Sequence, residues 1–365
     1  MAPSMTVDDF DCLKVARYEL RLRACHAVSL PAFLGSTLRG AFGHALKQAV
    51  CMIDHRNCER CLLADRCPYP YLFETPVPAG EPLLRGQQNA PRPFVLEPPV
   101  LRPLAGQVWR LPKRHDEAPT VAAPPAFATT SSTFSSNERH DLRAGDTLTF
   151  GLLLIGPAID CLPYVVLAVS EMGRRGLGAT RGRFALVDVA SVDEAGNKQV
   201  VYTSDSGRFS QSGLEHRSLR ELLRARLAGV ESNDALKLCF ATPTRIRVQD
   251  DLQTGVGFEL LVRNLLRRVS LLIRVHCGTR MDVDFRGLLA RAPGVEKYRE
   301  SLRWDDWQRY SNRQQTSMRL GGFVGEIEYR GDAIKEYLPL VAAGELLHIG
   351  TGTSFGLGKY EIVTR

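Results

Sequence analysis

The chain has 365 residues, of which 47 are lysine or arginine and 40 are aspartate or glutamate, so its formal net charge is +7. Hydrophobic residues make up 44% and charged residues 24%, the mix of a globular protein with room for about two domains. No apolar run reaches the ~20 residues that cross a bilayer, and residues 1–11 are polar and acidic, unlike a signal peptide. Composition therefore excludes disordered, collagen-like, membrane and small secreted proteins, and we expect a cytoplasmic protein.

Apolar residues follow strand and helix periods in an order that is similar in the two halves of the chain. In the first half they predict a strand, a helix, a strand, a helix and a strand at residues 17–28, 33–50, 147–156, 158–172 and 183–189. A short strand at 94–96 and a helix at 219–227 are also expected. In the second half they predict a strand, a helix, two paired strands, a helix and a strand at 237–248, 258–275, 303–310, 322–329, 333–343 and 359–363.

A shift of 176 residues superimposes parts of the two halves: Leu162-Pro163 falls on Leu338-Pro339, Gly182 on Gly358, and Leu186-Val187 on Ile362-Val363. A repeat this long indicates a duplicated domain rather than a solenoid, whose periods are ~20–50 residues. Chance matching of common helix and strand patterns is the alternative.

We therefore expect an α+β fold with tandem duplicated ferredoxin-like (RRM-like, β-α-β-β-α-β) domains. The first is expected at residues 12–203, with a four-cysteine zinc-loop insertion at 51–67 and a proline-rich insertion at 76–125. A connecting segment at 204–235 precedes the second domain, at 236–365, which ends in a glycine-rich loop.

Four cysteines lie within 17 residues and have the spacing of metal ligands: Cys51, Cys58, Cys61 and Cys67. A Cys-x2-Cys turn with two flanking thiolates can complete a tetrahedron around zinc, and His55 could replace one ligand. An iron–sulfur cluster and a loop without metal are the alternatives. Because four protein ligands leave no open position, we expect the zinc to be structural and not catalytic.

Two glycine-rich turns each follow a predicted helix and precede a predicted strand, whereas dinucleotide and P-loop motifs run from strand to helix. Glycine lets the backbone approach another polymer and offers N–H groups to phosphates, so we predict RNA contacts there. A turn that only packs against its own domain is the alternative. The candidate residues are Arg174, Arg175, Gly176, Gly178 and Arg181 in the first turn and Gly350, Gly352, Thr353, Ser354, Gly356, Gly358 and Lys359 in the second.

The helix expected at 33–50 places His44 one turn before Lys47 on a polar face. A histidine with a pKa near neutrality suits proton transfer at a ribose 2′-hydroxyl, and a lysine could stabilise charge on the phosphorus. A solvated surface pair is the alternative. HExxH, GxSxG, Walker and two-metal carboxylate patterns are missing from the sequence, so a nuclease of this sequence is expected to work without a catalytic metal.

Several segments together resemble the CRISPR repeat-processing endoribonucleases of the RAMP superfamily, which cut precursor CRISPR RNA. They cover nearly the whole chain, and the terminal glycine loop is the most specific of them. The matching segments are Leu34 to His44 (LGSTLRGAFGH), Cys58 to Tyr69, Leu72 to Pro76 (LFETP), Trp307 to Gln314 (WQRYSNRQ), Gly321 to Gly325 (GGFVG) and Gly352 to Gly358 (GTSFGLG).

The resemblance implies two ferredoxin-like domains with CRISPR repeat RNA or crRNA along their shared cleft. It also implies metal-independent attack by a 2′-hydroxyl, which leaves a 2′,3′-cyclic phosphate and a 5′-hydroxyl. His44 matches the family's general acid or base, His26 is the second choice, and Lys47 and Arg39 are chosen on geometry. Subunits of a CRISPR effector complex are further expected partners, and the alternative function is a non-catalytic subunit that holds crRNA there.

A predicted hairpin over residues 304–325 offers further RNA contacts. Arg309, Arg313 and Gln314 could contact phosphates and base edges. Its aromatic residues could stack on bases, although alternating aromatic residues in strands also suit a core: Trp304, Trp307 and Tyr310.

Overall fold

The structure is a computed structural model of the chain. It describes residues 5–53, 57–78, 80–81, 84, 90–99, 139–210, 216–228, 230, 234–306, 308–311 and 316–363, with the backbone alone for 308–311 and 316–319. His55, Trp307, Arg313 and Gln314 lie outside the described residues, as does most of the proline-rich insertion. Within the described residues, no helix is long and apolar enough to cross a membrane.

The first half of the chain forms an antiparallel sheet whose strand order is β3-β5-β1-β6-β7-β8, with the short β9 pairing with β1. Two helices cover one face of this sheet, α1 (Gly35–Val50) and α3 (Leu162–Arg175). The strands are β1 (Lys14–Ala24), β3 (Phe94–Glu97), β5 (Thr147–Ile155), β6 (Phe184–Val192), β7 (Lys198–Thr203), β8 (Arg208–Phe209) and β9 (Arg217–Ser218).

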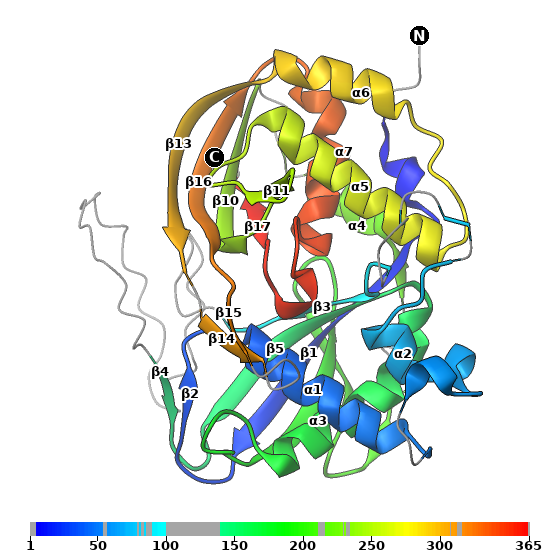
Figure 1. Cartoon of the computed structure of the whole chain (residues 1–365), viewed down its shortest axis with the longest axis vertical. Coiled ribbons are helices and arrows are strands. Elements are labelled where there is room, and N and C mark those ends of the chain that lie inside the picture. The colour runs from blue at the N-terminus through cyan, green and yellow to red at the C-terminus, as the bar shows by residue number, and fades with distance from the viewer. Residues whose placement is uncertain are drawn as a thin grey trace.

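The second half forms a four-stranded antiparallel sheet with the order β13-β16-β10-β17. Its helices are α5 (Phe258–His276) and α7 (Ile334–Leu347), and in Figure 1 this half lies above the first. The strands are β10 (Ala235–Thr244), β13 (Glu296–Asp305), β16 (Gly322–Arg330) and β17 (Tyr360–Ile362).

The two halves share one arrangement. In each half a β-α-β-β-α-β succession places its strands in the spatial order second, third, first, fourth, which is consistent with ferredoxin-like folds. The expected α+β class is confirmed at this level. A common origin of the two halves, and the domain limits given above, stay predictions.

Alternation of side chains along β1 explains how the halves join. Tyr18, Leu20 and Leu22 are buried under α1 and α3, while Arg17 and Arg21 point to the other face. At one end of the sheet, Val15 and its neighbours Val95, Leu153 and Ile155 belong instead to the core of the second half. The two halves therefore bury apolar side chains in a common cluster.

The strand expected at 322–329 is confirmed as β16, whereas the strand expected at 303–310 needs correction. Arg303 to Asp305 end β13, which does pair with β16, but residues 308–311 form a separate strand, β14 (Gln308–Ser311), paired with β15 (Thr316–Arg319). Most of β13 has no apolar alternation because it is a charged, exposed edge strand, and so its first residues escape prediction.

Smaller elements connect and cover the sheets. Of these, sequence periodicity predicts only α4, with the bounds that the structure gives. They are η1 (Val7–Phe10), β2 (Val28–Pro31) paired with β4 (Arg139–Leu142), α2 (Pro68–Phe73), α4 (Leu219–Leu227), β11 (Arg247–Val248) paired with β12 (Asp251–Leu252), α6 (Phe285–Arg291), and the 3-10 turns η2 (Cys58–Arg60), η3 (Ala64–Arg66), η5 (Gly156–Cys161), η6 (Ala292–Gly294) and η7 (Thr353–Phe355).

Candidate RNA-cleavage site

The helix α1 carries the three candidate catalytic residues. Its buried side consists of apolar side chains such as Leu38, Phe42 and Leu46, which pack into the core of the first half. His44 lies on the exposed side of the helix. A proton donor or acceptor at this position is accessible to a bound polymer.

Arg39 and Lys47 lie two turns apart on α1, and each contacts an aromatic ring. The Arg39 guanidinium carbon is 4.5 Å from the ring centroid of Phe355 and 5.3 Å from that of Phe73. The Lys47 Nζ atom is 4.8 Å from the ring centroid of Tyr69. Both cations therefore rest on aromatic rings of α2 and of the second glycine-rich turn. Lys47 follows His44 by three residues, so these two side chains occupy neighbouring positions on the helix surface.

The second glycine-rich turn, residues 350–358, is called here the C-terminal loop. Its η7 turn packs on β3 and on the start of α1, so a loop of the second half contacts the candidate helix of the first. Thr353 and Ser354 are buried, with 8% and 5% of their surface exposed. The structure therefore gives this loop a packing role, and its contact with RNA stays a prediction.

Backbone groups of the C-terminal loop are largely occupied within the chain. The amides of Phe355, Gly356, Leu357 and Gly358 donate hydrogen bonds to chain carbonyls at 2.9–3.4 Å. Gly358 has φ +73° and a Cβ there would stand 1.8 Å from the Ile349 carbonyl oxygen, so only glycine fits. Close packing, and not only phosphate binding, accounts for the glycine at this position.

The first glycine-rich turn connects α3 to β6. Arg174 and Arg175 both pair with Glu171, whose pKa their hydrogen bonds lower to about 2. Arg181 is exposed and adopts φ +51°, and Gly178 packs against Leu30 of β2. This turn has the exposed guanidinium groups that phosphate contacts require, although two of them share a carboxylate.

The two turns close in the same way. Leu177 donates its amide to the carbonyl of Gly182 at 2.8 Å, and Ile349 donates to that of Gly358 at 2.9 Å. The residue before each donor has positive φ: Gly176 at +90° in the first turn and His348 at +59° in the second. Gly182 and Gly358 keep the 176-residue spacing of the sequence repeat, whereas the donors Leu177 and Ile349 are 172 residues apart, so the duplication stays a prediction.

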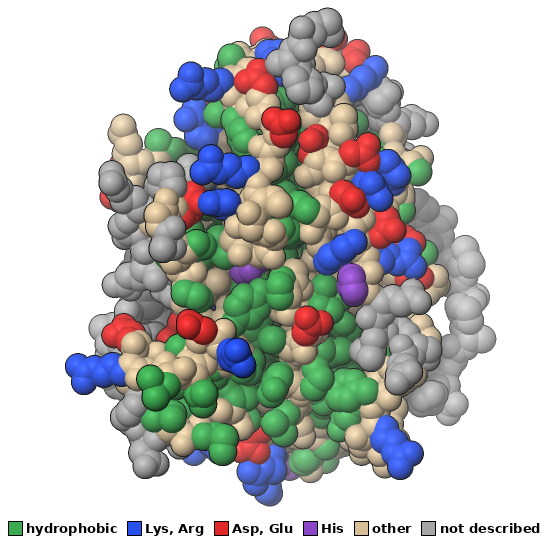
Figure 2. Space-filling model, turned by 90° about the vertical axis from the view of Figure 1, so that its right-hand side faces the viewer, with side chains coloured by type: hydrophobic (Ala, Val, Ile, Leu, Met, Phe, Trp, Pro, Cys, Tyr) green, Lys and Arg blue, Asp and Glu red, His purple; other side chains and the backbone are tan. Residues whose placement is uncertain are grey.

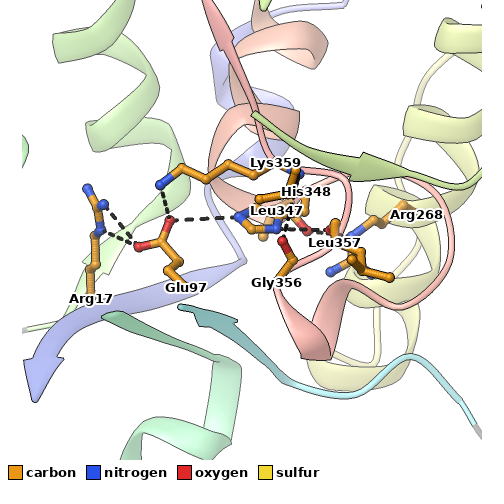
Figure 3. A network of polar contacts seen from close by, with 9 residues as sticks. Arg17, Glu97, Arg268, Leu347, His348, Gly356, Leu357 and Lys359 are labelled. Carbon is orange, nitrogen blue, oxygen red and sulfur yellow. Dashed lines mark hydrogen bonds and ion pairs between the residues drawn. The ribbon is translucent and has the colours of Figure 1, made fainter. Parts of the chain in front are cut away.

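A buried polar network joins the halves beside the C-terminal loop (Figure 3). Glu97, the last residue of β3, accepts from Lys359 Nζ at 3.1 Å and from Arg17 Nη2 at 3.0 Å. His348, which is fully buried, lies with Nε2 3.7 Å from Glu97 Oε1 and donates from Nδ1 to the Leu357 carbonyl at 3.1 Å. Lys359, a predicted RNA contact, is therefore an ion-pair partner of Glu97.

Burial and charge act in opposite directions on this network. Burial alone would raise the pKa of Glu97, but Lys359, His348 and Arg17 hold it well below its usual value, so the carboxylate is ionised. Burial lowers the pKa of His348, against the effect of Glu97, so the imidazole is neutral near pH 7. Behind it, Arg268 of α5 donates from Nε to the Leu347 carbonyl at 2.6 Å.

The four candidate zinc ligands, Cys51, Cys58, Cys61 and Cys67, line one pocket of about 390 Å³. All four are free thiols, and burial raises the pKa of two of them, Cys58 and Cys67. The donor set suits zinc. In the described part of the chain, however, no three or more His, Cys, Asp or Glu side chains are grouped so that they could hold a metal ion, so the zinc stays a prediction.

Apolar side chains surround this pocket. Met52, Leu63, Tyr164 and Leu167 line it and are each at least 45% exposed. Figure 2 shows hydrophobic side chains gathered over the lower half of the face that includes α2, while charged side chains dominate the upper half. The cysteine segment therefore lies beside an apolar surface.

The remaining candidates are spread over the molecule. His26 is exposed and accepts a hydrogen bond from the Arg183 amide at 3.2 Å, next to the first glycine-rich turn. Trp304 is 41% exposed at the end of β13. The side chains of Arg309 and Tyr310 lie outside the described residues, as do Arg313, Gln314 and Trp307.

Comparison with known protein families shows which families the two halves of the chain match. Residues 13–214 match the family model AF_1859_N, an N-terminal domain, and residues 238–360 match the model for CRISPR-associated endoribonuclease Cas6. The second half of the chain belongs to the Cas6 family of CRISPR-associated endoribonucleases. The resemblance read from the sequence is confirmed, and the Cas6 match begins in β10 and ends in β17, so it includes the C-terminal loop.

Relatives of this Cas6-family chain are distant. An uncharacterized protein of Archaeoglobus fulgidus is 23% identical over 336 residues, which are 91% of this chain and 92% of that protein. A Thermus thermophilus Cas6 product complex aligns with TM-score 0.51 and 15% identity over 96% of this chain and 99% of the other. A partial Cas6-RT-Cas1–Cas2 complex also gives TM-score 0.51, at 12% identity over 99% of this chain and 47% of the other. These likenesses show the fold.

Sequence reasoning missed the polar network at the junction. Glu97 stands in a four-residue strand followed by prolines, and His348 in a stretch that reads as the end of a helix. The one feature of the sequence that could have pointed to this network is the glycine-rich turn, because glycines there allow segments of the other half to pack closely against it. Nothing in the spacing of Arg17, Glu97 and Lys359 indicates that they meet.

Proposed function

We propose that this Cas6-family chain cleaves precursor CRISPR RNA within its repeats, without a catalytic metal. A general base removes the proton of a ribose 2′-hydroxyl, and the 2′-oxygen forms a bond to the adjacent phosphorus. The bond from phosphorus to the 5′-oxygen breaks, and a general acid protonates that oxygen. The products are a 2′,3′-cyclic phosphate and a 5′-hydroxyl, so no water or cofactor is consumed. The resulting guide RNAs serve antiviral defence.

His44 is the residue that we propose for acid or base catalysis. It is exposed on α1, and the C-terminal loop, within the part of the chain that matches Cas6, packs on the start of the same helix. This juxtaposition is the observation that carries the proposal, since RNA held at the loop would pass α1. Lys47 and Arg39 would need to leave their aromatic rings to reach the phosphate.

RNA binding is proposed to rest mainly on exposed cations. Arg174, Arg175 and Arg181 in the first turn are accessible. Lys359 contributes less than its sequence position implies, because Glu97 neutralises it. Binding that uses several phosphates weakens steeply with salt.

A structural zinc at the four cysteines is also proposed. Its support is the donor set and the common pocket that the cysteines line. The ion would connect the end of α1 to the start of α2 and so fix the apolar surface around Tyr69. It would take no part in cleavage.

Incubation of the full chain with a repeat RNA in EDTA tests the proposal. We expect cleavage at one phosphodiester, with a fragment that gains a 3′-phosphate only after acid opening of the cyclic ester, and a 5′-end that a kinase can label directly. Cleavage that requires added Mg²⁺, or a 5′-phosphate product, would contradict the mechanism. Binding of the repeat RNA without any cleavage product would show that the chain is not an endoribonuclease.

A non-catalytic RNA-binding subunit is the second candidate. The position of Arg39 and Lys47 against aromatic rings favours it, because both cations are then held in packing contacts and are not presented to a phosphate. This candidate predicts tight binding of crRNA with intact RNA at every pH.

A further inference from the structure

The two glycine-rich turns differ at one equivalent position. Gly176 ends α3 with φ +90° and ψ 151°, and His348 ends α7 with φ +59° and ψ 167°. Glycine adopts this conformation without strain, whereas for other residues it is strained and persists only when the surroundings enforce it. A histidine where the first turn has glycine therefore indicates that its side chain is needed.

Contacts of His348 point to that need. Its ring is fully buried, Nδ1 donates to the Leu357 carbonyl inside the C-terminal loop, and Nε2 faces Glu97 of β3 at 3.7 Å. The imidazole thus stands between a strand of the first half and the loop of the second (Figure 3).

Lys359, at the other end of the same loop, connects the loop to Glu97 by an ion pair. Its Nζ atom contacts Glu97 Oε1 at 3.1 Å, while its backbone amide donates to Thr242 Oγ1 at 2.9 Å. Glu97 therefore faces the residue that precedes the loop by two positions and the residue that directly follows it. Arg17 holds the other carboxylate oxygen and fixes the orientation of Glu97.

We propose that Glu97 is a positioning residue: through Lys359 it holds the C-terminal loop against the start of α1 and so sets where RNA lies relative to His44. Glu97 does not touch RNA in this arrangement. Its removal frees the loop and leaves the positive charges of Arg17 and Lys359 uncompensated. The part of this inference that concerns cleavage rests on the proposed function, whereas the part that concerns the loop does not.

Hydrogen exchange of the full chain tests the loop directly. In Glu97→Gln we expect the amides of residues 349–358 to exchange at least about tenfold faster, with little change in α3 or β6. Asp188→Asn is the matched control, because Asp188 pairs with Arg21 on the same sheet face and its side chain is also 12% exposed. Unchanged exchange of the loop in Glu97→Gln would overturn the inference, as would equal loosening in Asp188→Asn.

Cleavage of repeat RNA tests the functional part. Glu97→Gln should bind RNA as tightly as the parent chain or more tightly, since a negative charge is lost, yet cut about tenfold or more slowly and at neighbouring phosphodiesters as well. A variant that is merely less stable would lose binding and rate together and keep its cleavage position. Parent-like rate and position in a variant with a loosened loop would overturn the positioning role.

Lys359→Met tests the connection through Lys359 and provides a second variant in case Glu97→Gln misfolds. If Glu97 acts through Lys359, the double variant Glu97→Gln/Lys359→Met should be no slower than Glu97→Gln alone, whereas additive losses would contradict that route. If the parent chain binds repeat RNA and never cuts it, the proposed function is wrong. The hydrogen-exchange result still tests whether Glu97 holds the C-terminal loop.

Discussion

Gly35 lies so close to Phe355 that a Cβ built on Gly35 would stand 1.9 Å from the Phe355 carbonyl oxygen. Gly35 begins α1, and Phe355 ends the η7 turn of the C-terminal loop. One turn further along α1, the Arg39 guanidinium covers the Phe355 ring. The backbone of the candidate catalytic helix therefore touches the loop of the other half directly, with no side chain between them.

Gly35→Ala should push the loop off α1. The new methyl group meets backbone that cannot rotate away, so we expect about 1–3 kcal/mol of destabilisation and a loss of RNA cleavage. Gly40→Ala is the matched control: among the described residues, no atom from outside the adjoining helix backbone lies within 4 Å of its Cβ position, and alanine should stabilise the helix by about 0.5–1 kcal/mol. Chemical denaturation of both variants decides this, and equal stability of the two would contradict the contact.

The sequence predicts the repeated unit well, since long helices and strands can be recognised from the regular period of their apolar residues. The helix expected at 258–275 matches α5, and the strand at 147–156 matches β5. The sequence predicts only the end of β13, because a charged edge strand has no apolar period. The short β3 was found although it carries a residue, Glu97, whose role depends on the other half.

Side-chain partners across the junction could not be predicted from one sequence. The polar face of α1 was predicted, and His44 is exposed as expected. The same helical geometry does not tell that Tyr69 and Phe355 stand opposite Lys47 and Arg39, because these rings come from α2 and from a loop more than 300 residues away. Local periodicity determines which residues share a face of a helix, whereas tertiary packing determines which side chains that face contacts.

His44→Ala should slow cleavage of repeat RNA by about 100-fold or more while affinity stays unchanged, since a general acid or base contributes ~10²–10⁴ in rate and little to binding. His216→Ala, which removes another exposed histidine, is the control and should cut at the parent rate. Single-turnover rates and filter binding measure the two effects. A parent-like rate in His44→Ala would transfer the catalytic role to another residue, with His26 the next to test.

Elemental analysis of the purified chain should find about one zinc per molecule if the four cysteines bind it as a structural site. Cys61→Ser should lose most of the metal, because one of four thiolates is gone, and should lower thermal stability. Cys239→Ser, a buried cysteine far from this segment in sequence, should keep its metal. A metal-free parent chain with four titratable thiols would reject the zinc, and iron with sulfide would favour the cluster.

His276 makes stability depend on pH. It ends α5, donates from Nε2 to the Pro91 carbonyl at 2.9 Å and accepts at Nδ1 from the Tyr71 hydroxyl at 3.2 Å, so the neutral ring is satisfied across the junction. Burial lowers its pKa to about 4. In the unfolded chain a histidine titrates near 6.5, so the unfolded state binds more protons between these values and stability falls as the pH drops from about 6.5 to 4.

The difference corresponds to about 3 kcal/mol between pH 7 and pH 4. His276→Gln keeps a donor for Pro91 and has no titration, so its free energy of unfolding should fall by about 3 kcal/mol less than that of the parent chain over this range. His140 and His348, whose pKa values burial also lowers, keep their share of the slope in both proteins. His216→Gln should leave the slope unchanged because that side chain is exposed. Denaturant titrations at pH 7, 5.5 and 4 measure the slopes, and parallel curves for His276→Gln and the parent chain would show that the buried ring is not protonated on unfolding.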